Sequence, residues 1–187
     1  MKAELITRGF EGRNEDYCKV VELEGHTLAV MADGMGGLSL GEEAAACVCD
    51  SLAEYVANNM GSDDLWHNAF SYADNKLREL SVAKRSNMGA AVTALIVSDS
   101  SFEVAWQGNV RLYVRRGGVD EQVTTDHVMD SGYGRKMLTR CLKGAGLRDN
   151  VATKKESLLD VNHLCLCTDG YYENDSCDDS TCLTIIL

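Results

Sequence analysis

Two acidic residues stand where apolar runs of strand length end, and each is followed by glycine. Asp33-Gly34 closes the run at residues 26–32, and Asp169-Gly170 closes the run at residues 163–168. An apolar run that ends in an acid and then breaks on glycine is typical of a strand that delivers a carboxylate to an open loop. Two such strands can meet as neighbours in a sheet. Because Mg²⁺ and Mn²⁺ prefer oxygen ligands, the pattern predicts a dinuclear site for a hard cation.

The loop at residues 7–16 carries a second set of charged groups. It places Arg8 and Arg13 beside Glu15 and Asp16. A guanidinium group suits bidentate contact with phosphate, and the two acids could add metal ligands or contacts through water. The alternative interpretation is a solvated loop with surface ion pairs, which contribute little to stability.

A third acidic stretch lies at residues 174–181, just before the apolar C-terminal run, and contains Asp175, Asp178 and Asp179. By itself such a stretch is usually only a solvated turn. Because it also stands at the end of an expected strand, it becomes a candidate source of further carboxylate ligands.

The apolar spacing predicts the helices that must support these loops. Residues 41–59 repeat apolar side chains at offsets of three and four, which is typical of a helix with one buried face. Ser62 or Asp63 is expected to cap a second helix that runs to about residue 84. A third, short helix is expected at residues 135–142.

Strands are expected in the remaining apolar segments, at residues 3–6, 17–23, 90–97, 102–107, 111–115, 151–154, 164–167 and 181–187. The strand at 90–97 has almost no polar side chain, so we expect it to be buried on both faces or nearly so. The strands at 102–107 and 111–115 flank a Gly108-Asn109-Val110 turn, and this spacing predicts an antiparallel meander.

Composition limits the classes of function. A chain of 187 residues with 45% hydrophobic content fits one globular domain over residues 1–187. Its formal net charge of −11 argues against a nucleic-acid partner, since phosphate neutralisation needs a basic face. The chain has no apolar run of membrane-spanning length and no signal-peptide core, so we expect no membrane association and a cytoplasmic location.

The eight cysteines support a reducing compartment. None forms a CxxC pair with zinc-ligand spacing. We interpret them as reduced structural residues, in preference to a zinc or disulfide framework.

Eight short motifs, in order along the chain, resemble those of the metal-dependent serine/threonine protein phosphatases of type 2C, in their short bacterial form. No single motif is decisive, but the ordered set is specific. The motifs are Asn14-Glu15-Asp16, Ala32-Asp33-Gly34-Met35-Gly36-Gly37, Gly89-Ala90-Ala91-Val92-Thr93, Gly108-Asn109-Val110-Arg111-Leu112-Tyr113, Thr125-Asp126-His127, Leu138-Thr139-Arg140, Leu166-Cys167-Thr168-Asp169-Gly170 and Asp178-Asp179-Ser180-Thr181.

The resemblance implies an α+β fold, a four-layer α-β-β-α sandwich of two mainly antiparallel sheets flanked by helices, with the site at one edge. Two Mn²⁺ or Mg²⁺ ions would be bridged by Asp33, and the Gly34 carbonyl would bind one of them. Asp169 and Asp178 would hold the other ion. Glu15 and Asp16 would support the pair through water molecules.

The implied activity is hydrolysis of phosphoserine and phosphothreonine in a protein substrate, presumed to be phosphorylated by a serine/threonine kinase. Two ions about 3.5–4 Å apart lower the pKa of a bridging water and clamp the phosphoryl oxygens during in-line attack. The nucleophile would be hydroxide, with no covalent phosphoenzyme, and the protein is expected to be a monomer.

Four departures from the family pattern concern the same site. The phosphate-binding arginine of the family corresponds to Glu11 here, so we favour Arg13 as the phosphate contact, with Arg8 as the alternative. Asn109 replaces a usual aspartate, which predicts weak or absent binding of a third metal ion. Met35 stands where some relatives carry a histidine proposed as a general acid. Few residues separate Arg140 from His163, so we expect a trimmed flap beside the site.

Two rival functions remain open from the sequence. A non-catalytic relative could keep the fold and bind a phosphoprotein or regulatory partner, and the displaced arginine and Asn109 favour that reading. Against it, Asp16, Asp33, Asp169 and Asp178 are all present, although clustered charges are costly to keep. The glycines at residues 34–37 could instead cradle a nucleotide phosphate, but no established nucleotide motif surrounds them.

Overall fold

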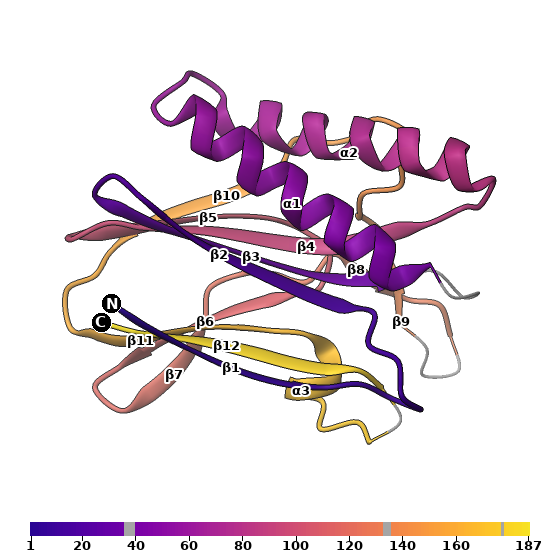
Figure 1. The fold of residues 1–187 in the computed structure, drawn as a ribbon. Coiled ribbons are helices and arrows are strands. Elements are labelled where there is room, and N and C mark those ends of the chain that lie inside the picture. Colours follow the sequence, from indigo (N-terminus) through magenta and orange to yellow (C-terminus); the bar gives the residue numbers. More distant parts are fainter. Residues whose placement is uncertain (36–39, 133–135, 177) are drawn as a thin grey trace.

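The computed structural model describes residues 1–35, 40–132, 136–176 and 178–187. Two five-stranded antiparallel sheets pack face to face in this part of the chain (Figure 1). The first sheet has the order β10-β5-β4-β3-β2, formed by Ala152–Ser157, Ser101–Gln107, Gly89–Val97, His26–Met35 and Asp16–Leu23. The second has the order β1-β12-β11-β6-β7, formed by Lys2–Arg8, Ser180–Ile186, Val161–Cys167, Arg111–Arg116 and Val119–Gln122.

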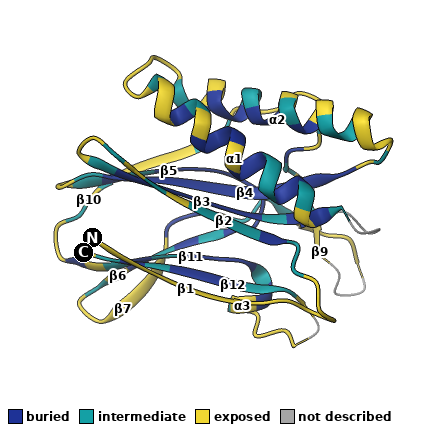
Figure 2. Cartoon of the chain, viewed as in Figure 1, coloured by how far each residue is buried: buried dark blue, intermediate teal, exposed yellow. Residues whose placement is uncertain are grey.

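Strand β4 is buried along its whole length, as its composition predicts. It is the central strand of the first sheet, and it lies between the two long helices and the second sheet (Figure 2). Alternate side chains therefore enter two different cores, with Val92 and Ala94 on the helix side and Ala91 and Leu95 between the sheets. Burial on both faces holds β4 in a fixed position. Strand β4 pairs with β3, the strand that carries Asp33.

Both long helices lie on the first sheet (Figure 1). Helix α1 spans Gly41–Asn59, and its buried stripe includes Val48, Leu52 and Val56, as expected. Helix α2 spans Leu65–Lys84, and its N-cap is Asp64, in a left-handed conformation with φ of 52°. The expected cap at Ser62 or Asp63 is therefore wrong by one or two residues.

The predicted class, two mainly antiparallel sheets flanked by helices, is confirmed. On the side of the second sheet, the described residues form one short helix, α3 at Asp169–Tyr172, which contacts β12. A two-stranded hairpin of β8 (Val128–Asp130) and β9 (Lys136–Leu138) stands apart from both sheets.

Two expected pairings are wrong, because each partner joins a different sheet. Strand β5 pairs with β4 and β10, whereas β6 pairs with β11 and β7, so the turn after β5 crosses between sheets and closes no meander. Gly108 makes this crossing with φ of 127°, a conformation that favours glycine. Likewise β3 and β11 are not sheet neighbours, and the ends that carry Asp33 and Asp169 belong to opposite sheets.

The expected helix at residues 135–142 is also wrong in its described part, from residue 136 onward. Lys136–Leu138 forms β9, and Leu142 exchanges two backbone hydrogen bonds with Ala90, of 2.9 and 3.0 Å. Pairing with the end of β4 satisfies the backbone groups that a helix would have used. Residue 135 lies outside the described residues.

The other expected strands are present with shifted ends, and β7 and β8 were not predicted. The seven cysteines within the described ranges are free thiols. None of the helices in those ranges is long and apolar enough to cross a membrane.

Candidate active site

Asp33 and Asp16 face each other across a strand pair at one edge of the first sheet. They are directly opposed in the β2–β3 register, so both carboxylates leave the sheet at the same end. The next residue, Gly34, donates its N–H to the carbonyl of Glu15 at 3.0 Å. A Cβ atom at residue 34 would overlap the Gly41 carbonyl at the start of α1, which explains why glycine follows the acid.

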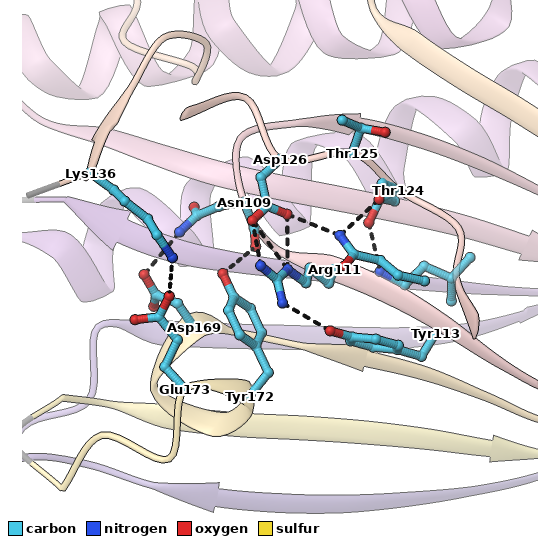
Figure 3. A network of polar contacts seen from close by, with 12 residues as sticks. Asn109, Arg111, Tyr113, Thr124, Thr125, Asp126, Lys136, Asp169, Tyr172 and Glu173 are labelled. Atoms are coloured by element: carbon cyan, nitrogen blue, oxygen red, sulfur yellow. Dashed lines mark hydrogen bonds and ion pairs between the residues drawn. The ribbon is translucent and has the colours of Figure 1, made fainter. Parts of the chain in front are cut away.

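Asp169 reaches the same place from the second sheet, as the first residue of α3. The side-chain amide of Asn109 donates to Asp169 Oδ2 at 2.9 Å, and the Tyr172 hydroxyl donates to the Asn109 carbonyl at 3.2 Å (Figure 3). The N–H of Gly170 donates to Asp169 Oδ1 at 3.1 Å. These contacts fix the orientation of the Asp169 carboxylate.

Thr168 joins the two sheets at this edge. Its hydroxyl donates to Asp16 Oδ2 at 2.9 Å and accepts the N–H of Thr181 at 3.0 Å. The other oxygen, Asp16 Oδ1, is buried and has no hydrogen-bond partner among the described residues. A buried carboxylate oxygen without a donor needs a water or a cation.

Burial and the neighbouring carboxylates raise the pKa values of Asp33, Asp16 and Asp178. Burial, then repulsion from Asp169, Asp16 and Asp178, raises the pKa of Asp33 well above its ordinary range. Burial raises the pKa of Asp16 to about 6, against the lowering effect of hydrogen bonds from Thr181 and Thr168. Burial and the charge of Asp169 raise the pKa of Asp178. The cluster therefore resists full ionisation unless positive charge joins it.

This donor set fits a hard divalent cation. Carboxylate oxygens are the ligands that Mg²⁺ and Mn²⁺ prefer, and Asp16 Oδ1 is an oxygen without a donor. No three acidic, imidazole or thiol side chains in the described ranges form a ready-made cage for one ion. Ions held here would keep several water molecules, which is usual for Mg²⁺.

The remaining predicted residues lie around this cluster in different ways. The Glu15 side chain lies against Gly41 at the first turn of α1. Asp178 is exposed but close enough to contribute to the field at Asp33. Arg13 is exposed in a turn bridged to Phe10, and the Arg8 guanidinium donates to the Asp175 carbonyl at 2.8 Å.

Asp179 has a structural role that the sequence did not reveal. Its two oxygens accept the N–H groups of Phe10 and Glu15, both at 2.6 Å. The start of β12 is thereby tied to the loop before β2. This tie positions Glu15 and Asp16 relative to the acidic turn.

A second unpredicted network supports Asp169 through Tyr172. Arg111 binds Asp126 with a bidentate pair of hydrogen bonds, 2.9 and 2.7 Å, and lies 3.6 Å from the centre of the Tyr172 ring (Figure 3). A bidentate pair combined with a stacked ring is geometrically restrictive. Arg111 is thus committed to positioning α3. In the sequence, only the residue types could indicate such a contact between Arg111, Asp126 and Tyr172, because no regular spacing relates the three positions.

The cluster opens into a cavity of about 600 Å³. Asp33 and Asp169 line it together with Asn109, the β8–β9 hairpin and two lysines, Lys136 and Lys143. Lys136 pairs with Glu173 at 2.6 Å, which connects β9 to the end of α3. A larger cavity, about 860 Å³, lies beside the α1–α2 connection and β10 and does not include either Asp33 or Asp169.

Comparisons with known proteins find the same fold in solved structures. Stp1 from Staphylococcus aureus has the same fold, with a TM-score of 0.85 and 20% identity over 100% of this chain and 94% of that chain. The serine/threonine phosphatase PstP/Ppp of Mycobacterium tuberculosis gives 0.83 and 18%, over 100% and 98%. A PstP catalytic domain solved in complex with two manganese ions gives 0.79 and 17%, over 98% and 96%.

A comparison with curated proteins found no match. The sequence model of the family described as Protein phosphatase 2C matches residues 10–183, which is nearly the whole chain. With that match, the chain belongs to the protein phosphatase 2C family.

Proposed function

We propose that this protein hydrolyses phosphoserine and phosphothreonine in protein substrates, using two Mn²⁺ or Mg²⁺ ions at the Asp33 cluster. One observation carries the proposal. Asp33 stands beside Asp16, Asp169 and Asp178 at the edge of a cavity, and burial together with repulsion from these acids raises its pKa. Divalent cations would relieve that repulsion.

Residues of both sheets would hold the ions. Asp33 would bridge them, the Gly34 carbonyl would bind one, and Asp169 and Asp178 would bind the other. Asp16 and Glu15 would act through water molecules. The bound pair supplies an activated water for in-line attack and neutralises the phosphoryl oxygens. The PstP structure solved with two manganese ions supports this number of ions.

The chain's own contacts would keep these ligands in place before substrate arrives. Asn109 directs one oxygen of Asp169, and Thr168 occupies Asp16 Oδ2 so that Oδ1 remains for a water. Preorganised polar groups of this kind need little rearrangement during the reaction.

The phosphate of the substrate would be contacted by an arginine. We propose Arg13, in the loop before β2, as a phosphate contact, with Arg8, the last residue of β1, as the alternative. The substrate would be a phosphoprotein made by an opposing serine/threonine kinase. The protein would act as a monomer.

A second candidate function is a catalytically inactive module that binds a phosphoprotein. The Asn109–Asp169 hydrogen bond favours it, because an amide occupies an oxygen that an ion would need. The exposed position of Arg13 favours it as well.

Phosphate release from p-nitrophenyl phosphate and a phosphothreonine peptide separates the two candidates. Metal-stripped protein is assayed with Mn²⁺, Mg²⁺ or EDTA, beside Asp33→Asn, Asp169→Asn and the control Asp99→Asn, an exposed acid between β4 and β5. The enzyme should recover activity with metal, and only the first two variants should lose it. Folded protein that binds Mn²⁺ without turnover would favour the binding module.

A further inference from the structure

We propose that Lys143 is a phosphate-contacting residue of this site, an inference that rests on the proposed function. Lys143 lines the same cavity as Asp33 and Asp169. Neither Arg8 nor Arg13 lines this cavity. A substrate phosphate that enters this cavity would therefore meet Lys143.

The backbone at Lys143 is held in place from two sides. Leu142 pairs with Ala90 at the start of β4 through two hydrogen bonds. The carboxylate of Asp74, on helix α2, accepts the N–H groups of Lys143, Gly144 and Gly146 at 3.0, 2.8 and 2.7 Å. Asp74 is only 3% exposed, so this anchor is shielded from water. The loop position is fixed by the helix layer and needs no substrate to form.

The absence of a side chain at Gly89 leaves room for Lys143 near the end of β3. Gly89 is opposite Met35 in the β3–β4 register. A Cβ atom at residue 89 would lie 3.2 Å from both the Met35 methyl carbon and Lys143 Cγ. The aliphatic stem of Lys143 and the Met35 side chain thus both lie next to Gly89, and both residues line the cavity. A long apolar stem with a charged tip commonly packs in this way.

The Lys143 ammonium has no acidic partner in the described ranges. It interacts with the Cys141 thiol, whose pKa is raised by burial and lowered in part by Lys143. A neutral thiol is a weak acceptor. A phosphate oxygen would be a much stronger partner for the same ammonium.

Lys136 lines the cavity too, but its situation differs. It is paired with Glu173 at 2.6 Å, so a phosphate would have to compete with that carboxylate for its ammonium. Lys143 has no such pair to break, which is why the phosphate contact is assigned to it.

The test compares Lys143→Met, which keeps an unbranched stem, with Lys143→Arg and with the control Lys154→Met, an exposed lysine on β10. Three quantities are measured with Mn²⁺: the KM for a phosphothreonine peptide, the inhibition constant of inorganic phosphate, and the Kd of Mn²⁺ by calorimetry. A charged hydrogen bond contributes enough that Lys143→Met should raise the first two together by about tenfold or more. Lys143→Arg should restore most of the loss. The Mn²⁺ affinity and the control should stay within about twofold.

Unchanged KM and phosphate inhibition in Lys143→Met would overturn the proposal, as would an equal loss of Mn²⁺ affinity, since Lys143 would then act on the metal site. Inactive wild-type protein would refute the proposed function. In that case, calorimetry of inorganic phosphate with the Mn²⁺-loaded wild type and Lys143→Met still tests the Lys143 contact. Phosphate binding that Lys143→Met weakens about tenfold supports the contact. Equal binding by both proteins, or none by the wild type, contradicts it.

Discussion

The Asn109 side chain donates its amide hydrogen to Asp169 Oδ2, so the residue that departs from the family pattern contacts a proposed metal ligand directly. Asn109 Oδ1, by contrast, is buried and has no partner among the described residues. The amide thus supplies a hydrogen-bond donor to the Asp169 carboxylate. An aspartate at this position would replace that donor with a second negative charge.

Replacing Asn109 with aspartate should therefore destabilise the metal-free protein and strengthen metal binding. The lost hydrogen bond and the new repulsion predict a loss of about 1–3 kcal/mol in the free energy of unfolding in EDTA. Thermal unfolding with and without Mn²⁺ measures both effects, with Asn162→Asp, an exposed residue on β11, as the control. If Asn109→Asp gains no Mn²⁺ affinity, this would count against the prediction that Asn109 weakens the binding of a third metal ion.

The stability of the metal-free protein should depend on pH through Asp16. Its pKa in the folded state is raised to about 6, so the folded protein binds a proton more tightly than the unfolded chain does. Its contribution is therefore lost as pH rises from about 4 to about 7, by roughly 1–3 kcal/mol. Urea unfolding in EDTA at both ends of that range measures the loss.

Asp16→Asn is the matched control for that measurement, because the amide oxygen can still accept the Thr168 hydroxyl but cannot titrate. The variant should be the more stable protein at pH 7 in EDTA and should show a flatter pH dependence. The same pH dependence in both proteins would mean that Asp16 is not the titrating group.

Metal binding should release protons near pH 6, because ions bind the ionised carboxylates of a cluster whose pKa values are raised. Calorimetric titration with Mn²⁺ in two buffers of different ionisation enthalpy gives the number of protons released. We expect a release at pH 6 that falls toward pH 8, and an Mn²⁺ affinity that increases over the same interval. A proton count of zero at pH 6 would contradict the raised pKa values of the cluster.

Asp74 should act as a positioning residue for Lys143. Asp74→Ala removes the acceptor of three backbone N–H groups, and we expect the free energy of unfolding to fall by about 2–4 kcal/mol. The remaining folded protein should show a higher phosphate inhibition constant at an unchanged Mn²⁺ affinity. The neighbouring exposed Asn75→Ala should change neither. An unchanged phosphate inhibition constant in Asp74→Ala would mean that Asp74 does not position Lys143 for phosphate binding.

The features visible in the sequence are those that a local pattern determines. The bounds of α1 and the two-sided burial of β4 follow from apolar spacing, and the acids at Asp33 and Asp169 do stand at strand ends. The sheet to which each strand belongs depends on contacts far apart in the chain. For this reason the strands ending at Asp33 and Asp169 were expected in one sheet, although they lie in two.

The supporting residues were missed for a similar reason. Asp74 lies in the middle of α2, where the sequence shows only a polar residue within a helix. Its carboxylate nevertheless accepts backbone N–H groups from a loop about seventy residues later in the sequence. A short helix was predicted up to Leu142, whereas Leu142 pairs with Ala90 of β4. No spacing within residues 135–146 indicates either contact.

The most direct test is to titrate metal-stripped protein with Mn²⁺ while following phosphate release from a phosphothreonine peptide, in the wild type and in Asp33→Asn. The account predicts two ions per chain in the wild type, activity that rises as they bind, and little binding or turnover in the variant. Turnover by Asp33→Asn close to the wild-type rate, or full wild-type turnover in EDTA, would contradict it.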